Sequence, residues 1–406
     1  MRGNCIVAQS GGPTAVINAS ACGVIQAAFE SSKIVGVYGA HNGILGVVNE
    51  RIFDLGREKP QTIEGLRHTP AAALGSCRYK VKTEEDFAAI VEVFKKYDIR
   101  YFFYIGGNDS MDTADKVNRL AASQGYEFCA MGVPKTVDND LALTDHCPGY
   151  GSVTKYLATM TMEAGRDTEA LYTTDTVNVI EAMGRNAGWI AAGASLAKRA
   201  SEDAPHIILL PEVPFDETAF TRKVAEWVDN IGRCVVVVSE GTRYSDGSYV
   251  SEQKGDFATD AFGHVQLGGA ASFIKNLVER DVKVKSRYAF PSTIQRCGAH
   301  FASETDCQEA YMVGRRAVEL AMTGENGKMV TLVRTGDNPY QCTTGAESLS
   351  EVANGEKLFP AEWITEDGFG VTQEFVDYAR PLIQGEVSVP MKDGLPDFMR
   401  FEKYFI

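Results

Sequence analysis

Short apolar runs alternate with longer segments of helical periodicity through the first three-quarters of this chain. Residues 234–239 (CVVVVS), for example, suit one buried strand, and residues 84–96 have the apolar spacing of an amphipathic helix. Strands that alternate with helices form βαβ units, and sheets built from such units are largely parallel. The alternation therefore predicts an α/β fold with doubly wound parallel sheets.

The same pattern locates the individual elements. We expect strands at residues 5–9, 33–38, 101–105, 128–133, 177–180, 206–210, 234–239 and 329–333. We expect helices at residues 15–29, 84–96, 152–164, 188–198, 216–229, 269–279 and 305–322. Neither an internal repeat nor a low-complexity linker divides the chain, so a domain boundary near residues 145–151 rests on the element pattern alone.

Length and charge limit the partners that the chain can take. Its 406 residues, 44% hydrophobic and 23% charged, are enough for two or three domain-sized units with buried cores. The net charge of −14 opposes binding to nucleic acid or to an anionic membrane, so an anionic substrate must meet a local basic pocket. Membrane spans need about 18 to 20 apolar residues, and no segment reaches that length or resembles a signal peptide. The nine scattered cysteines indicate reduced thiols, so we expect a cytoplasmic protein.

Two polar strings that follow apolar runs carry most of the chemistry. Residues 105–110 read IGGNDS, and residues 134–140 read PKTVDND. In an open α/β sheet, ligands bind at the carboxyl ends of the strands, where these strings are expected to lie. Glycines admit backbone N–H groups to phosphate, carboxylates hold Mg²⁺ or accept a proton, and a lysine neutralises anionic oxygens. The strings suit phosphoryl transfer, although the second would equally be a solvated turn if it stood alone.

A glycine pair, Gly11 and Gly12, lies between the first expected strand and the first expected helix. Glycine allows close backbone approach there, and a helix N-terminus favours an anion, so a phosphate site is physically reasonable. Such a pair by itself is more often just a turn. The sequence contains neither the P-loop pattern of nucleotide-binding proteins nor the protein-kinase catalytic loop. Catalytic carboxylates must therefore come from residues 105–110 and 134–140.

These segments, together with residues 75–79 (GSCRY), 181–185 (EAMGR) and 239–241 (SEG), resemble the signatures of the phosphofructokinase family, in the family's order and with similar spacing. The resemblance implies two Rossmann-like doubly wound lobes of the phosphofructokinase fold, with the active site in the cleft between them. It implies a phosphoryl-donor-binding lobe at residues 1–148, completed by part of residues 297–406. It implies a sugar-phosphate-binding lobe at residues 149–296.

The resemblance also implies roles for single residues. Asp138 matches the general base that takes the proton of the sugar 1-hydroxyl, with Asp140 and Thr136 beside it. Arg185 matches the arginine that meets the phosphoryl group in flight. The pyrophosphate site is assigned to Gly11, Gly12, Arg78, Lys135 and Asp109. The fructose 6-phosphate site is assigned to Thr136, Asp138, Met183, Gly184, Arg185, Glu240, Arg287 and Arg296.

Two arginines, Arg287 and Arg296, match the pair that binds the sugar 6-phosphate in the family. The family's counterpart of Arg287 reaches across from a neighbouring subunit, which implies a homodimer or homotetramer. Thr176 stands where many members have a further inter-subunit arginine, so that contact is expected to be missing here.

Three positions decide the metal and the phosphoryl donor. Asn108 replaces an aspartate that helps to hold Mg²⁺ in the family; it keeps one acceptor oxygen but loses the charge, so Asp109 or Asp140 is expected to carry the ion. ATP-using members have glycine at the positions of Asp109 and Lys135, whereas pyrophosphate-using members have Asp and Lys. A carboxylate there repels the α-phosphate of a nucleotide, and a lysine binds the leaving phosphate.

The sequence thus predicts a reversible, Mg²⁺-dependent transfer of phosphate from pyrophosphate to fructose 6-phosphate, a glycolytic reaction. The nearest alternative is an ATP-dependent enzyme of the same fold. A non-catalytic regulatory subunit is disfavoured because Asp138, Asp140 and Arg185 are retained. A dinucleotide-binding oxidoreductase is disfavoured because the first glycine loop lacks the G-x-G-x-x-G pattern. His264 and His300 have no partner at a diagnostic spacing and are expected to pack or to form hydrogen bonds.

Overall fold

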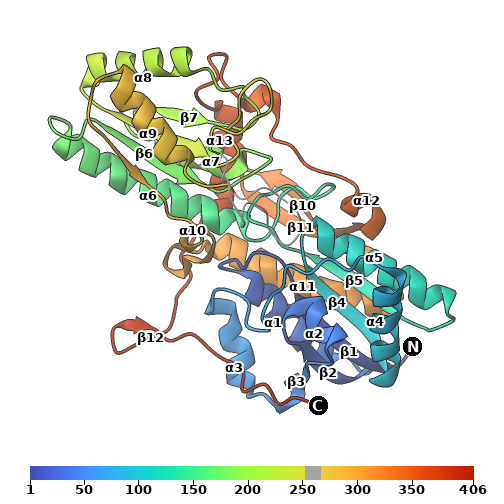
Figure 1. Cartoon of the computed structure of the whole chain (residues 1–406). Helices are drawn as coiled ribbons and strands as arrows, with labels where there is room; N and C mark the ends of the chain where they lie inside the picture. Colours follow the sequence, from blue (N-terminus) through green and yellow to red (C-terminus); the bar gives the residue numbers. More distant parts are fainter. Residues whose placement is uncertain (252–266) are drawn as a thin grey trace. The chain divides into compact units, whose positions relative to one another are not determined.

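The computed structural model describes residues 1–251 and 267–406, so His264 lies outside the described residues. The chain divides into two compact units (Figure 1). The first unit comprises Met1–Ser152, Arg296–Lys357 and Gly385–Ile406. The second comprises Val153–Gln295 and Leu358–Gln384. The chain therefore returns to each unit after leaving it, and the second unit includes a C-terminal stretch that the sequence pattern does not mark.

The first unit is built on a seven-stranded sheet with the order β11-β10-β5-β4-β1-β2-β3. Its strands are β1 (Gly3–Gln9), β2 (Ile34–Ala40), β3 (Ile52–Asp54), β4 (Ile99–Gly106), β5 (Cys129–Pro134), β10 (Lys328–Asp337) and β11 (Tyr340–Ser348). The five central strands pair in parallel, and β3 and β11 are antiparallel edges. The strand order reverses between β4 and β1, which is the position where open α/β sheets bind ligands.

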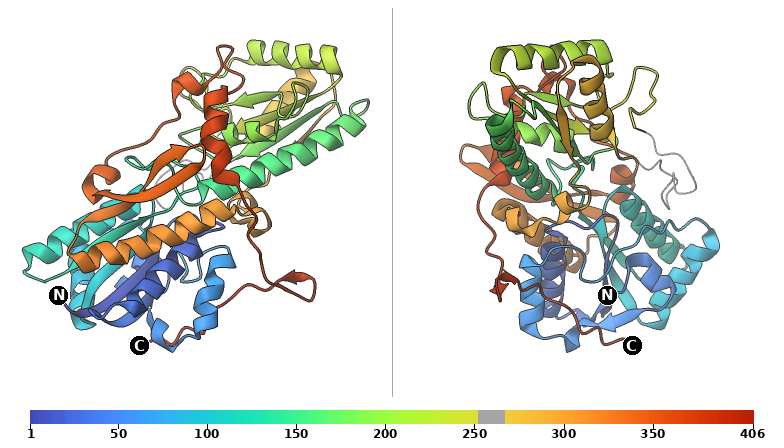
Figure 2. Two further views of the ribbon diagram at one scale, coloured as in Figure 1. Left: turned by 180° about the vertical axis from the view of Figure 1, so that it is seen from behind. Right: turned by 60° about the vertical axis from the view of Figure 1, so that its left-hand side comes forward.

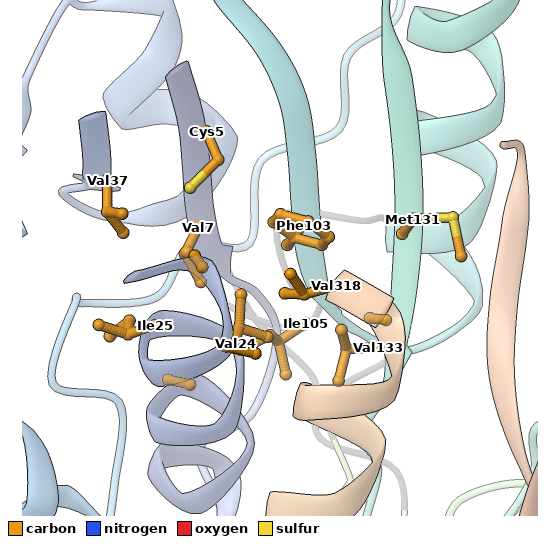
Figure 3. Close-up of a cluster of buried hydrophobic side chains, with 14 of the residues drawn as sticks. Cys5, Val7, Val24, Ile25, Val37, Phe103, Ile105, Met131, Val133 and Val318 are labelled. Atoms are coloured by element: carbon orange, nitrogen blue, oxygen red, sulfur yellow. The ribbon is translucent and has the colours of Figure 1, made fainter. Parts of the chain in front are cut away.

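Helices cover both faces of this sheet because alternate strand residues point to opposite sides. Val7 and Phe103 belong to a core beneath α1 (Ile17–Glu30) and α11 (Glu304–Thr323) (Figure 3). Their neighbours Ile6 and Phe102 belong to a second core beneath α4 (Glu84–Lys96) and α5 (Asn108–Ser123). Burying a side chain of this size stabilises the fold by roughly 1.5–3 kcal/mol.

Local capping explains where several helices begin and end. Thr83 and Asp86 form a capping box at the start of α4. The carboxylate of Asp216 accepts two backbone N–H groups at the start of α8 (Glu217–Ile231). α8 ends at Ile231 and is capped by Gly232, whose positive φ of 79° terminates a helix without strain.

The second unit contains a four-stranded parallel sheet with the order β7-β8-β6-β9. Its strands are β6 (Val177–Ala182), β7 (Ile207–Leu209), β8 (Cys234–Ser239) and β9 (Ser286–Ala289). The strands lie between α6 (Tyr150–Leu171) and the pair α8 and α9 (Ala270–Asp281) (Figure 2). Trp189, at the start of α7 (Trp189–Gly193), packs edge-on against Phe359 and Trp363, so the returning C-terminal stretch is anchored by aromatic contacts.

The remaining elements are short. They are α2 (Gly43–Val48), α3 (Pro60–Gly65), α10 (Ile294–Cys297), α12 (Leu349–Ala353), α13 (Gln373–Ala379), β12 (Met391–Lys392) and β13 (Leu395–Pro396). The 3₁₀ turns are Leu55–Arg57, Leu66–His68, Ala194–Ala197, Ala299–Phe301, Ala361–Trp363 and Arg380–Ile383. Within the described ranges, no helix combines the length and the apolar character needed to cross a membrane.

The predicted α/β fold with parallel sheets is confirmed. The helix expected at residues 188–198 is in fact α7 followed by a 3₁₀ turn. The pattern also missed α5, whose first turn is polar, and the edge strands β9 and β11, whose residues are largely exposed or half-buried.

Candidate active site

The carboxyl ends of three neighbouring strands in the first unit bring the predicted donor-site loops together. β1, β4 and β5 end at Gln9, Gly106 and Pro134 and lie side by side in the sheet. Backbone hydrogen bonds continue beyond the strands, from Ser10 N to Ile105 O at 2.9 Å and from Lys135 N to Gly106 O at 3.1 Å. The glycine pair, the start of α5 and the loop after β5 therefore meet at the point where the strand order reverses.

Basic side chains pass close to the backbone of Gly11 and Gly12. Gly11 has a φ of 75°, and a Cβ there would lie 3.0 Å from Lys135 Nζ. A Cβ on Gly12 would lie 2.9 Å from a terminal nitrogen of Arg296. Ser76 Oγ donates to Gly11 O at 2.6 Å, which ties the segment that carries Arg78 to the same loop.

Lys135 is a buried cation in this loop cluster, with 4% of its surface exposed. Its Nζ donates to the Gly12 carbonyl at 3.0 Å. Burial lowers the pKa of Lys135 to about 8; the charges of Asp138 and Asp140 oppose the shift, and Arg296 and Arg78 add to it. Three basic groups gathered beside a glycine loop create a strong local positive potential in a chain whose net charge is −14.

The segment after Lys135 forms a turn that presents two aspartates. Asp138 N donates to Thr136 Oγ1 at 3.1 Å. Asn139, between the two aspartates, is fully buried and has a φ of 55°, while Asp138 and Asp140 remain partly exposed. Burial and, next in size, the neighbouring charge of Asp138 together raise the pKa of Asp140 to about 7. A pair of neighbouring carboxylates at a turn suits general base chemistry.

Asn108 and Asp109 open helix α5 directly after Gly107. The Asn108 side-chain oxygen is buried and accepts no hydrogen bond from any described residue. The Asp109 carboxylate is about half exposed and lies 3.6 Å from Lys80 Nζ, a partner that the sequence did not suggest. No group of three His, Cys, Asp or Glu side chains that could hold a metal gathers in residues 1–251 and 267–406. The unpaired, buried oxygen of Asn108 suits a hard cation such as Mg²⁺, which keeps several waters and needs few protein ligands when phosphates supply the rest.

In the second unit, two loops follow the adjacent strands β6 and β8. Ser239 Oγ donates to Gly184 O at 2.6 Å, and Gly184 N donates to Glu240 Oε1 at 3.2 Å. A Cβ on Gly241 would lie 2.0 Å from Arg185 O, so only glycine fits there. The structure therefore brings together Gly184, Arg185 and Glu240, as the resemblance implies.

Met183 is fixed by a residue that sequence reasoning missed. Its N–H donates to the side-chain oxygen of Gln295 at 3.1 Å, and Gln295 is buried. Gln295 precedes the predicted Arg296, but nothing in its spacing distinguishes it from an ordinary polar residue.

Arg185 and Arg296 both retain an unused donor. The Nε atom of each is buried and has no hydrogen-bond partner among the described residues. Buried polar groups are almost always paired in the complete state of a protein, so an unpaired guanidinium nitrogen indicates a missing partner. An anionic oxygen of a substrate would supply it.

Arg287 lies apart from the loops that follow β6 and β8. It is on the edge strand β9, opposite Asn178 near the start of β6, and its guanidinium pairs with Asp175. Its side chain is 60% exposed. Thr176 donates to the Tyr172 carbonyl and presents no charge.

The fold and these loops define a member of the phosphofructokinase family, and the family's sequence model, described as Phosphofructokinase, matches residues 4–321. The chain belongs to this family, as predicted. It is 48% identical to the pyrophosphate–fructose 6-phosphate 1-phosphotransferase of Halomonas elongata, over 99% of this chain and 96% of that one. It is 47% identical to the protein of the same name from Methylococcus capsulatus, over 98% and 95% of the two chains. The crystal structure of a pyrophosphate-dependent phosphofructokinase from Marinobacter aquaeolei is similar with a TM-score of 0.92 and 45% identity, covering 100% of this chain and 97% of the other.

Proposed function

We propose that this chain transfers a phosphoryl group from pyrophosphate to the 1-hydroxyl of fructose 6-phosphate, giving fructose 1,6-bisphosphate and phosphate. The observation that carries the proposal is the buried Lys135 ammonium, which lies against the Gly12 carbonyl near Arg78. A compact polyanion such as pyrophosphate suits this basic pocket. Two of the most similar relatives carry the name of this activity.

Each chemical step has a residue to perform it. Asp138 accepts the proton of the 1-hydroxyl as that oxygen attacks the nearer phosphorus, and Asp140 and Thr136 orient the Asp138 turn. The new bond joins the sugar oxygen to phosphorus, the bridging P–O bond of pyrophosphate breaks, and phosphate leaves toward Lys135. Arg185 stabilises the charge on the phosphoryl group in flight. The reaction is reversible because the bonds that break and form have similar energies.

The second substrate is held by residues of the second unit and by Arg296. Met183 and Gly184 line the sugar, and the Glu240 carboxylate accepts its hydroxyl groups. Arg296 binds the 6-phosphate with its unused Nε donor. Accordingly, we assign donor binding to the first unit and the sugar contacts of Met183, Gly184 and Glu240 to the second.

Arg287 completes the 6-phosphate site of a neighbouring copy in this proposal. Its place on an edge strand and its 60% exposure make it available to another chain. We therefore propose a homodimer or homotetramer. The pairing with Asp175 would be exchanged for the sugar phosphate on assembly.

Mg²⁺ is the proposed cofactor. Asp109 and Asp140 would hold it, with the unused oxygen of Asn108 as a weaker contributor. When bound, the ion neutralises the phosphate oxygens and makes the phosphorus more electrophilic.

Asp109 also favours pyrophosphate over ATP, because its carboxylate repels an α-phosphate. We place the enzyme in the cytoplasm and in glycolysis, where both sugar phosphates occur.

Phosphorus NMR of the purified chain tests the function in both directions. With Mg²⁺, pyrophosphate and fructose 6-phosphate, we expect the 1-phosphate resonance of the bisphosphate and free phosphate to appear in equal amounts. With fructose 1,6-bisphosphate and phosphate, pyrophosphate should form. Turnover of neither mixture would refute the proposal.

A further inference from the structure

Lys357, the last residue of the first unit's middle segment, reaches back to the turn that carries the two aspartates. Its backbone N–H donates to Asp140 O at 2.8 Å. Its ammonium donates to Asn139 Oδ1 at 3.2 Å, to Thr144 O at 3.3 Å and to Asp145 O at 2.7 Å. The same side chain thus joins the turn at residues 138–140 to the segment that follows it.

The Lys357 side chain contacts the turn through Asn139. It is fully buried and has a left-handed φ of 55°, which asparagine tolerates better than most residues. Besides the Lys357 ammonium, its Oδ1 accepts the N–H of Cys147 at 2.9 Å. Hydrogen bonds to its side chain therefore fix Asn139 in place, whereas Asp138 and Asp140 on either side remain partly exposed.

An ammonium group has three donors, and Lys357 uses them on three oxygens of this region. Removing the ammonium would leave those oxygens short of a donor in a partly buried setting, which is unfavourable. The turn would then move to recover hydrogen bonds. Asp138 and Asp140, directly on either side of Asn139, would move with it.

We propose that Lys357 is a positioning residue for phosphoryl transfer: it holds Asn139 and the Asp140 backbone so that the carboxylates of Asp138 and Asp140 keep their catalytic placement. The inference rests on the proposed function. Lys357 touches neither substrate in this account and acts through Asn139.

The effect should appear in kcat rather than in substrate affinity. A displacement of about 1 Å in a catalytic group can cost about 100-fold in rate. The Gly11 and Gly12 loop and the Arg185 loop are held by separate hydrogen bonds, from Ser76 and Ser239, so substrate binding should survive. General loosening of the fold would instead raise KM and lower kcat together.

Kinetics of Lys357→Met, Lys357→Arg and a matched control, Lys392→Met, provide the test. Lys392 is exposed on the β12–β13 hairpin, far along the chain from the proposed active site. For Lys357→Met we expect kcat to fall about 10- to 100-fold, with both KM values within about threefold of wild type. Lys357→Arg, which restores a cationic donor, should recover at least a fifth of wild-type kcat. Lys392→Met should match wild type.

A second variant, Asn139→Gly, removes the hydrogen bond to Lys357 without disturbing the backbone conformation at residue 139. Asn139→Gly accepts the positive φ but loses Oδ1, so its kcat should also fall by at least about fivefold with little change in KM. The double variant with Lys357→Met should be less impaired than the product of the two single effects, because both remove the same hydrogen bond. If Lys357→Met fails to fold, Asn139→Gly alone decides the question.

Two results would overturn the inference: a kcat within twofold of wild type in the folded variants, or a loss that appears mainly in KM. A wild-type chain without pyrophosphate-dependent activity would instead refute the proposed function. If the wild type is active and replacing Lys357 leaves kcat unchanged, only the positioning role is refuted.

Discussion

At the scale of single residues, Lys135 is the group whose environment most constrains the chemistry. A buried lysine next to two arginines is unfavourable until an anion arrives, and its lowered pKa of about 8 reflects that cost. Lys135 is charged below about pH 8 and loses its proton above it, so the proposed binding of pyrophosphate should depend on pH.

Replacing Lys135 with methionine should raise the KM for pyrophosphate by about 10- to 100-fold, because a charge-assisted hydrogen bond is worth roughly 1.5–3 kcal/mol. The KM for fructose 6-phosphate should change much less. The ratio of wild-type to variant kcat/KM for pyrophosphate should fall as the pH rises through about 8, as the wild-type ammonium deprotonates. Rates measured from pH 6.5 to 9.5 test this; a ratio independent of pH would contradict the role of the ammonium.

Asp138→Asn keeps the shape of the side chain but removes the proton acceptor. We expect kcat to fall by about 10²- to 10⁴-fold, the usual range for general base catalysis, with little change in fructose 6-phosphate binding. Steady-state kinetics together with a binding titration measure both quantities. Retention of more than about a third of wild-type kcat would exclude Asp138 as the base.

At the scale of residues, the sequence did not predict which charged side chains form ion pairs with one another. The Lys135 and Asp138 positions followed from a linear string, whereas the ion pairs Lys80–Asp109 and Asp175–Arg287 join segments that are distant in sequence. Such contacts depend on the folded geometry, which neither spacing nor composition reveals.

At the scale of elements, strands with consecutive apolar residues were predictable, and strands at sheet edges were not. β8 (Cys234–Ser239) is buried at every position and was located correctly. β9 has two exposed residues among its four, and β11 is largely half-buried, so neither presents an apolar run. The ends of β1, β4 and β5 were predictable to within a residue, whereas the candidate site at the edge where the strand order reverses stays a prediction.

One buried cluster connects α11 to the β10–β11 pair. His146 lies between Asp145, at 2.8 Å, and Glu309 of α11, at 2.7 Å. Glu309 accepts the hydroxyl of Tyr340 of β11, and Asp145 accepts a donor of Arg334 of β10. Burial alone would lower the pKa of His146, but the charges and hydrogen bonds of Glu309 and Asp145 outweigh burial and raise it to about 9.

This raised pKa predicts a stability that depends on pH. The unfolded chain loses the proton near the ordinary histidine pKa of about 6.5, whereas the folded chain keeps it to about pH 9. The stabilisation by protonated His146 is therefore complete below about pH 6.5 and is lost as the pH rises to about 9. Urea unfolding of wild type and His146→Gln should differ by about 2 kcal/mol more at pH 6.5 than at pH 9.5. An equal difference at both pH values would contradict the assignment.

At the scale of the whole molecule, the chain forms two units, each of which receives more than one segment of sequence. The boundaries at residues 148 and 296 stay predictions; in the structure the chain changes unit after Ser152 and after Gln295, and residues 358–384 return to the second unit. That return depends on aromatic contacts around Trp189, which a pattern of periodicity does not encode.

Mixing two inactive variants tests whether copies share sites. If Arg287 serves a neighbouring chain, a hybrid of Asp138→Asn and Arg287→Ala subunits assembles one site in which both residues are intact. Activity should therefore return after the subunits are dissociated and reassembled together, but not after either variant is treated alone. An active monomer in sedimentation experiments would rule out the shared site.

The choice of phosphoryl donor tests the central claim most directly. We compare the kcat/KM of the unmodified protein for pyrophosphate and for ATP, with saturating fructose 6-phosphate and Mg²⁺. If Lys135 binds a terminal phosphate and Asp109 opposes a nucleotide, as proposed, pyrophosphate should be favoured at least ~100-fold, a difference of about 2.7 kcal/mol in transition-state binding. Equal or better use of ATP would contradict the account and would favour the ATP-dependent alternative.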